Sequence, residues 1–193
     1  MAAWNRVFGT DLPYAAGVAG GVGAFVAGYL VTFLVKGQNI TSAFGGFDEI
    51  PISDIPLPAD WQIIGWYFYQ MHNVDTEVSI SFVGRSETYT LSSSVDPWLA
   101  LVPVAALVIA GFGVARAASA ETLERGAVAG ATVVLGYFVL VVVFALLVGW
   151  SASRAGGSIS VGPSPVPAAI LAGVLYPVVL GAIGGAAAGA VET

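Results

Sequence analysis

The residues that could carry chemistry in this chain are few, and three of them lie close together. His72 is the only histidine, and Asp75 and Glu77 follow it closely, so the three could bind a metal ion at a surface. A surface histidine beside acids is more often simply solvated. We therefore predict no metal site and no cofactor.

Other reactive groups and motifs are missing from the sequence. The chain has no cysteine, which excludes disulfides, thiolate metal sites and thiol catalysis. We find no phosphate-binding loop, no dinucleotide fingerprint and no nucleophile elbow. We therefore predict no catalytic residues and no enzymatic activity.

The elements that must position these residues are four long apolar segments. None of the four contains an Asp, Glu, Lys, Arg or His, and each has about the 20 residues that a helix needs to cross a bilayer. Charged residues make up 9% of the chain, against about 25% in soluble domains. We predict a polytopic membrane protein, surrounded by membrane lipid, with helices at about 14–35, 97–115, 126–150 and 166–191.

The fold class that follows is an all-α membrane protein, a four-transmembrane-helix bundle that forms a single membrane domain over residues 1–193. Residues 37–96 form its extracellular insert between the first two helices. The prolines and glycines of 43–60 predict an extended strap, and the aromatic residues of 61–73 predict a short helix on the membrane surface. Alternation over 77–92 predicts a β-hairpin. The Ser/Gly-rich residues 151–165 are predicted to be a link.

Charge favours one orientation. The turn between the second and third helices carries Arg116 and Arg125, and Arg6 precedes the first helix, so we place both termini in the cytoplasm of a plasma membrane. The insert then lies outside, which agrees with the glycosylation sequon at Asn39. It holds eight acids and one base, a balance that repels nucleic acid and suits a halophilic source.

Two groups of residues are candidates for contacts. The predicted interaction surface is the aromatic and acidic part of the insert: Trp61, Trp66, Tyr67, Tyr69, His72 and Asp75. The second group consists of small residues and a proline that let helices approach closely. Its members are Gly20, Gly28, Gly111, Gly130, Gly173, Pro177, Gly181, Gly185 and Gly189.

Two functions remain open. The first is a non-enzymatic accessory or structural subunit that engages a protein partner, or a second copy, through its aromatic and acidic outer segment. The alternative is a small uncoupled channel or transporter built from two parallel helical hairpins. A faint repeat favours the alternative, since Gly28-Tyr29 matches Gly136-Tyr137, but the shared Gly-rich composition would also produce such matches by chance.

Most of the chain, from the first predicted helix to the fourth, resembles a known family. The stretch from Trp61 through Gly65–Tyr69 and His72 to Asp75, followed by 124–130, 175–177 and 181–185, resembles a haloarchaeal family of small four-helix membrane proteins without a characterised function. The resemblance implies a halophilic archaeal plasma membrane. It brings no catalytic or binding residues.

Overall fold

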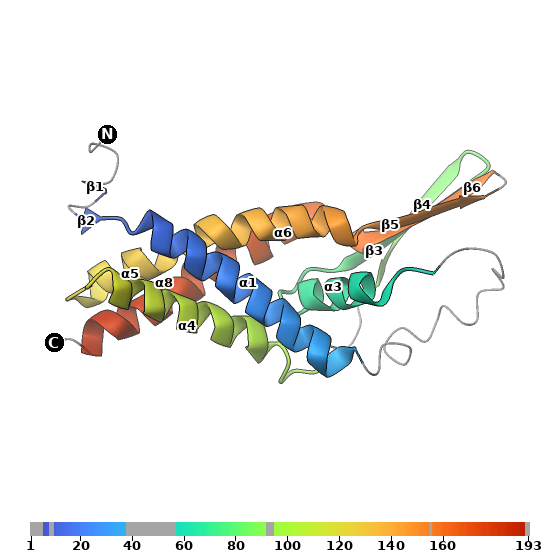
Figure 1. Cartoon of the computed structure of the whole chain (residues 1–193). Coiled ribbons are helices and arrows are strands. Elements are labelled where there is room, and N and C mark those ends of the chain that lie inside the picture. Colours follow the sequence, from blue (N-terminus) through green and yellow to red (C-terminus); the bar gives the residue numbers. More distant parts are fainter. Residues whose placement is uncertain (1–5, 8–9, 38–56, 92–94, 155, 192–193) are drawn as a thin grey trace.

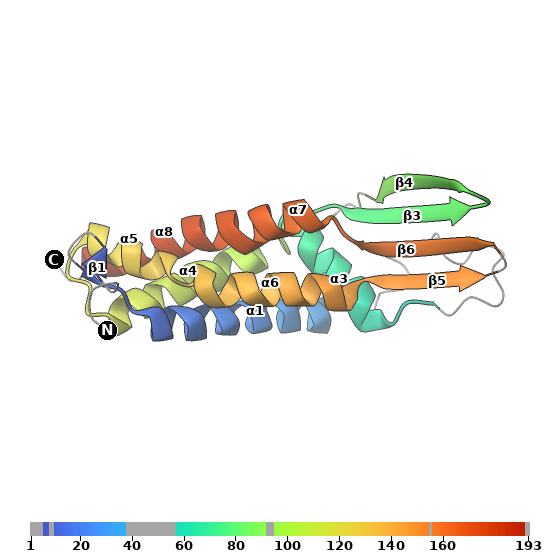
Figure 2. The same cartoon turned by 90° about the horizontal axis from the view of Figure 1, so that it is seen from above.

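The computed structural model describes residues 6–7, 10–37, 57–91, 95–154 and 156–191. Helices α1 (Tyr14–Lys36) and α4 (Leu101–Ala117) run beside a third rod, in which α5 (Leu123–Ala131) continues into α6 (Val134–Val148) (Figures 1 and 2). The last rod joins a short α7 (Pro165–Pro167), a π-helix η1 (Ala168–Leu175) and α8 (Tyr176–Val191). The predicted strap at 43–60 and the sequon at Asn39 fall mostly or wholly outside these residues.

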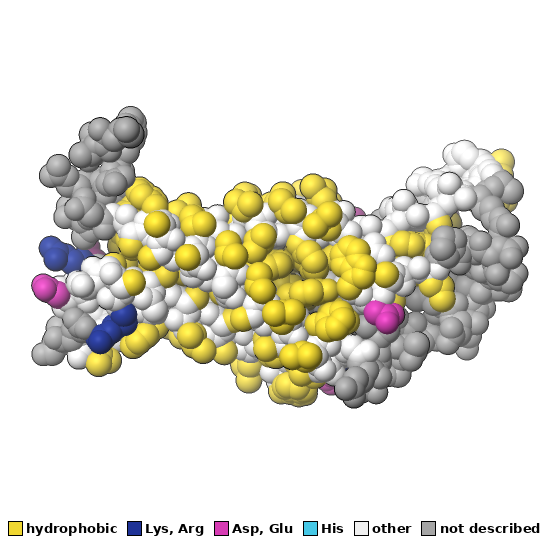
Figure 3. Space-filling view, viewed as in Figure 1, with side chains coloured by type: hydrophobic (Ala, Val, Ile, Leu, Met, Phe, Trp, Pro, Cys, Tyr) yellow, Lys and Arg dark blue, Asp and Glu magenta, His cyan; other side chains and the backbone are white. Residues whose placement is uncertain are grey.

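Three of these rods are long and apolar enough to cross a membrane: Tyr14–Lys36, Leu123–Val148 and Pro165–Val191. The fourth, α4, is apolar but has only 17 residues. Hydrophobic side chains cover the helical part in Figure 3, and the charged side chains in view gather at its two ends. The three rods agree with a membrane protein.

A four-stranded antiparallel sheet extends from one end of the helices (Figure 2). Its strands are β3 (Thr76–Phe82), β4 (Arg85–Leu91), β5 (Trp150–Arg154) and β6 (Gly157–Pro163), in the order β4-β3-β6-β5. Two short strands, β1 (Arg6–Val7) and β2 (Thr10–Asp11), pair near the N-terminus.

The sheet corrects the predicted fold class, because the protein is mixed α/β and not an all-α four-helix bundle. The predicted hairpin is present as β3 and β4, but it is only half of the sheet. Residues 151–165 form no simple link, since β5 and β6 lie there and β6 pairs with β3 along seven residues. An isolated hairpin is marginal in water, and the second hairpin supplies the pairing that it lacks.

Two prolines of the helical rods, Pro103 and Pro177, have different surroundings. Pro103 is the third residue of α4, where its missing N–H breaks no intrahelical hydrogen bond. Pro177 follows the wide turns of η1, in a rod that changes from π- to α-helix at Tyr176. A proline at 177 cannot donate to the carbonyl of Gly173, which accounts for a widened helix just before it.

Candidate functional site at the α3 wedge

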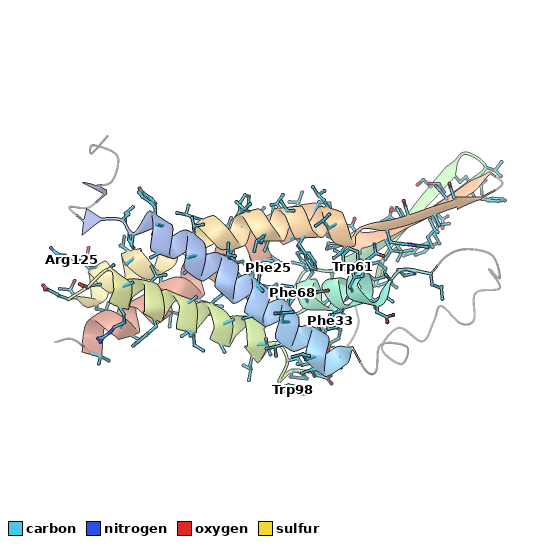
Figure 4. The ribbon with its side chains drawn as sticks, in the orientation of Figure 1. Phe25, Phe33, Trp61, Phe68, Trp98 and Arg125 are labelled. Carbon is cyan, nitrogen blue, oxygen red and sulfur yellow. The ribbon has the colours of Figure 1, made fainter. Side chains whose placement is uncertain are left out.

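Helix α3 (Asp60–Gln70) enters the helix bundle from the sheet end, and the chain then turns back into β3 (Figure 1). The Gln62 side chain caps its start by accepting the Ala59 N–H at 3.0 Å. Figure 4 shows Phe68 of α3 and Phe25 of α1 inside the molecule, and their ring centroids lie 5.3 Å apart. Phe25 also contacts the rings of Tyr137 and Phe144 of α6, so α3 fills the space between α1 and α6.

One face of α3 donates hydrogen bonds to the backbone of α6 and its C-cap. Gln62 Nε2 donates to the Gly149 carbonyl at 3.2 Å, and Trp66 Nε1 donates to the Val148 carbonyl at 2.8 Å. The last carbonyls of a helix have no intrahelical donor, and these two side chains supply donors there. One helical turn further on, the Tyr69 hydroxyl donates to the Val141 carbonyl.

His72 ends this row and is fully buried. Its Nδ1 lies 2.8 Å from the Phe68 carbonyl, which can only accept, so we infer that Nδ1 carries the proton. Nε2 then accepts the Tyr137 hydroxyl at 2.7 Å. Burial lowers the pKa of His72 to about 4, so the imidazole is neutral at pH 7.

The chain reverses immediately after His72. Asn73 adopts a left-handed φ of 56°, a conformation that asparagine tolerates better than most residues. Its Nδ2 donates to the Tyr176 hydroxyl at 2.6 Å, and the His72 and Tyr176 rings lie 5.2 Å apart. The turn therefore joins α3 to the start of α8, next to the π-helix.

A second group of contacts holds the other side of α3. Lys36 Nζ lies 2.5 Å from Asp96 Oδ2 and 4.9 Å from the centroid of the Tyr67 ring. The Tyr67 hydroxyl accepts the Asp96 N–H at 3.0 Å. The hydrogen bond from Lys36 holds the pKa of the Asp96 carboxyl below its usual range. These three residues tie the end of α1 and the segment before α4 to α3.

The structure places most residues of the predicted interaction surface in the interior of the protein. Trp66, Tyr67, Tyr69 and His72 are buried within the protein, so their predicted surface position is wrong. A helix with aromatic residues on every side fits an interior better than an interface with water. Trp61, which is 40% exposed, and Asp75, which is also exposed, remain accessible.

His72 is also separated from the acids beside it in the sequence. The Asp75 side chain is exposed, and the Glu77 carboxylate accepts the Ser164 hydroxyl at 2.7 Å. Among the described residues, no group of three or more metal-binding side chains comes together. The geometry gives His72 a hydrogen-bonding role between elements.

Sequence reasoning missed the partners of α3. Tyr137 and Tyr176 were assigned no site role from the sequence, whereas both contact the His72–Asn73 turn. The available signal was a tyrosine in the middle of an apolar segment, because its buried hydroxyl needs a hydrogen-bonding partner.

The predicted helix-packing residues lie at contacts between elements. A Cβ added to Gly111 of α4 or to Gly130 of α5 would overlap the carbonyl oxygen of Gly181 of α8. The remaining members meet neighbouring helices or α3 or, for Pro177, are buried. They are Gly20 against Val114, Gly28 against Phe68, Gly173 against Phe138, Gly185 against Gly126 and Gly189 against Thr122.

Neither the curated proteins nor the solved structures contain a match to the chain. A family of unknown function, DUF7978, matches residues 5–192. Because that match covers nearly the whole sequence, the chain belongs to this family of unknown function.

Proposed function

We propose that this protein is a multi-pass, non-enzymatic subunit of the plasma membrane that binds a partner protein through its outer sheet. The acidic composition and the resemblance described above favour the membrane of a halophilic archaeon. In this proposal α1, α4, α5–α6 and α7–α8 cross the bilayer, and both termini are cytoplasmic.

The fourth crossing is supported by the position of α4. Its 17 residues span about 25 Å. It packs along α1 and along α8, and α1 and the rod that contains α8 are long enough to cross. The start of α1 and the end of α8 lie at the same end of the bundle in Figure 1, which supports an even number of crossings. Arg116 and Arg125 are near that end, in agreement with a cytoplasmic side.

The observation that carries the proposal is an exposed apolar patch at the tip of the sheet. Its side chains near the tip are Ile80 at 43%, Phe82 at 63% and Val83 at 74% exposure. Tyr89, at 51%, lies on the same face nearer the base, and Arg85 and Glu87 of β4 border the patch. A seven-residue strand is about 23 Å long, so the tip lies well beyond the helix ends and away from lipid. Exposed apolar clusters of this kind mark contacts with other proteins.

The backbone at the tip supports the same interpretation. Val83 has a φ of 44° in the turn between β3 and β4, and it is followed by Gly84 with a φ of 76°. A left-handed conformation is strained for a β-branched residue, and Asn is the usual choice before Gly in such a turn. An exposed valine kept in a strained position favours a role for its side chain in binding.

The test combines capture and topology. The full chain is cross-linked in native membranes, purified in mild detergent and analysed by mass spectrometry, with wild type compared with Val83→Asn and Phe82→Ser. We expect a partner with wild type and several-fold less of it with both variants, while Val83→Asn raises thermal stability by relieving strain. Ser81→Ala, on the opposite face of β3, is the matched control and should capture as wild type does.

Topology is tested on the same cysteine-free chain. A single cysteine at Ser86 should react with an impermeant maleimide from outside, and one at Ala118 should react only after the membrane is opened. The absence of any captured protein, or labelling of Ser86→Cys only from inside, would contradict the proposed function.

Among the described residues, no contact supports the second candidate function, an uncoupled channel or transporter. The space between α1 and α6 is occupied by the buried rings of α3. The internal repeat stays a prediction, and we carry this candidate no further.

A further inference from the structure

The two faces of the sheet differ in chemistry. Residues paired directly across antiparallel strands point to the same face. Val78 pairs with Val161, and both are buried on the side where α3 packs. The opposite face carries two rows of hydroxyls across all four strands. They are Thr88, Ser79, Ser160 and Ser151, and then Ser86, Ser81, Ser158 and Ser153.

This hydroxyl face contains no charged residue in either row. The charged pair of β4, Arg85 and Glu87, aligns with Phe82 and Ile80 and so points to the apolar face. On the hydroxyl face, Ser79 and Thr88 lie 3.0 Å apart, as do Ser81 and Ser86. Neutral donors and acceptors line these two rows, and Glu77 lies on the same face in the next row toward the base of the sheet.

A hollow of about 380 Å³ lies at the base of the hydroxyl face, where the sheet meets the end of α6. Ser79, Ser151 and Ser160 line its sheet side, and Ala145 and Leu146 of α6 line its helix side. Figure 1 shows the sheet continuing from the end of α6 and leaning away from the bundle axis to the side on which α6 lies, with α3 on the other side of the sheet.

The helix side of the hollow continues into the lipid-facing surface. Leu146 is 78% exposed, and Val166 and Ile170 of the adjoining rod are 66% and 57% exposed. The hollow thus has a polar wall above the proposed bilayer and an apolar wall that leads into it. A ligand that matches both walls is an amphiphile.

The charge and the hydroxyl groups of the polar wall determine which lipid headgroups can bind there. Glu77 is the one charged side chain that lines the hollow, and the Ser164 hydroxyl donates to its Oε1 at 2.7 Å. No basic side chain lines the described part of the hollow, so a phosphate would meet a carboxylate without a counter-charge. Sugar hydroxyls, in contrast, donate to a carboxylate and exchange hydrogen bonds with serines.

We propose that this hollow binds a neutral glycolipid, with the sugar headgroup on Ser79, Ser151, Ser160 and Glu77 and a hydrocarbon chain along α6 beside Leu146. The inference rests on the proposed membrane placement, in which the base of the sheet lies at the outer bilayer surface. It is independent of the partner at the sheet tip, because the hollow lies at the opposite end of the strands.

The test is a binding measurement on the full chain in a detergent without a sugar headgroup, since a glycoside detergent would compete. The probes are a diglucosyl glycerol diether, a phosphatidylglycerol with the same ether-linked chains, and maltose. Native mass spectrometry and titration should show binding of the glycolipid at least about tenfold tighter than of either other probe. Equal binding of phosphatidylglycerol would overturn the headgroup assignment, and equal binding of maltose would overturn the lipid assignment.

Two matched pairs of substitutions locate the site. Ser79→Val with Ser160→Val removes two hydroxyls that line the hollow and should weaken glycolipid binding about tenfold, since each lost hydrogen bond costs severalfold in affinity. Ser81→Val with Ser158→Val makes the same change one row further out, on the same strands and face, and should leave binding unchanged. Equal weakening of glycolipid binding by both pairs, or no weakening by either pair, would overturn the proposal.

The outcomes separate this inference from the proposed function. If the protein does not prefer the glycolipid, while maleimide labelling and partner capture are as expected, the glycolipid site alone is refuted. Inverted labelling would refute the membrane placement on which both rest.

Discussion

The end of the bundle near the termini and the end near the sheet are held together in different ways. Near the termini, α4, α5 and α8 meet through glycine backbone, as where Gly111 and Gly130 face the carbonyl of Gly181. Near the sheet, α3 contacts α6 through the side chains of Trp66, Tyr69 and His72, which reach backbone and hydroxyl groups. The first contact depends on the absence of side chains, and the second depends on paired polar atoms.

This difference shows what each region tolerates. A glycine contact has no room for one added carbon, but it contains no group that titrates. The α3 contact is also closely packed, since a Cβ added to Gly65 would overlap the Val148 side chain. In addition, each donor that is lost there leaves a buried acceptor unpaired. The following predictions test this contrast, from the largest expected effect to the smallest.

Gly111→Ala should cost about 3 kcal/mol of unfolding free energy, because the new Cβ would overlap the Gly181 backbone and the helices must separate. Gly113→Ala is the matched control on the same helix, since nothing lies within 4 Å of its added Cβ. We expect it to stabilise by up to about 1 kcal/mol through helix propensity. Unfolding by SDS in mixed micelles measures both, and equal stabilities would remove the basis for a glycine contact.

Acid should destabilise the α3 region, because it favours protonation of His72. The imidazole has its ordinary pKa of 6.5 in the unfolded chain and about 4 in the folded protein, so the unfolded state takes up the proton first. The stability that neutral His72 provides is therefore complete above about pH 6.5 and lost as the pH falls toward 4. The loss reaches about 3 kcal/mol.

The control for that pH dependence is His72→Asn with Tyr137→Phe, which removes both the titrating ring and the hydroxyl that bonds to it. The double variant should be less stable at pH 7 and should lack this part of the loss between pH 6.5 and 4. An unchanged acid profile in the double variant would show that another group is responsible. Unfolding followed by tryptophan fluorescence over that pH range distinguishes the two results.

Trp66→Phe should have the smallest of the three effects, about 1–2 kcal/mol, since it keeps an aromatic ring but leaves the Val148 carbonyl without its indole donor. Trp61→Phe is the control on the same helix, where the indole is 40% exposed. It should change the melting temperature little. A larger loss for Trp61→Phe than for Trp66→Phe would contradict the role assigned to the α3–α6 hydrogen bonds.

The sequence predicted some elements well because their signal is local. The apolar segment at 14–35 corresponds to α1, the aromatic stretch at 61–73 to α3, and the alternation at 77–92 to β3 and β4. The strands at 150–163 were missed because serine and glycine composition outweighed a clear alternation. In Ser158-Ile159-Ser160-Val161 every second residue is apolar, which is a strand signal.

The site was harder to predict than the fold because it depends on contacts between distant segments. His72 is followed by Asp75 and Glu77 in the sequence, which suggested a solvated surface. Its actual partner, Tyr137, is 65 residues away. Single-sequence patterns carry no information about such pairs, so the prediction placed the aromatic residues of α3 at a surface.

By itself, the sequence determined that the chain has long segments apolar enough to cross a membrane and that it has no thiol chemistry. Both follow from composition, namely uncharged segments and a missing cysteine. The structure alone decided that α3 lies inside the bundle with a neutral histidine, and that residues 151–165 complete a sheet. Both depend on which distant surfaces meet. A buried polar group is stable only beside a partner, and a strand only beside another strand, and folding brings those partners together.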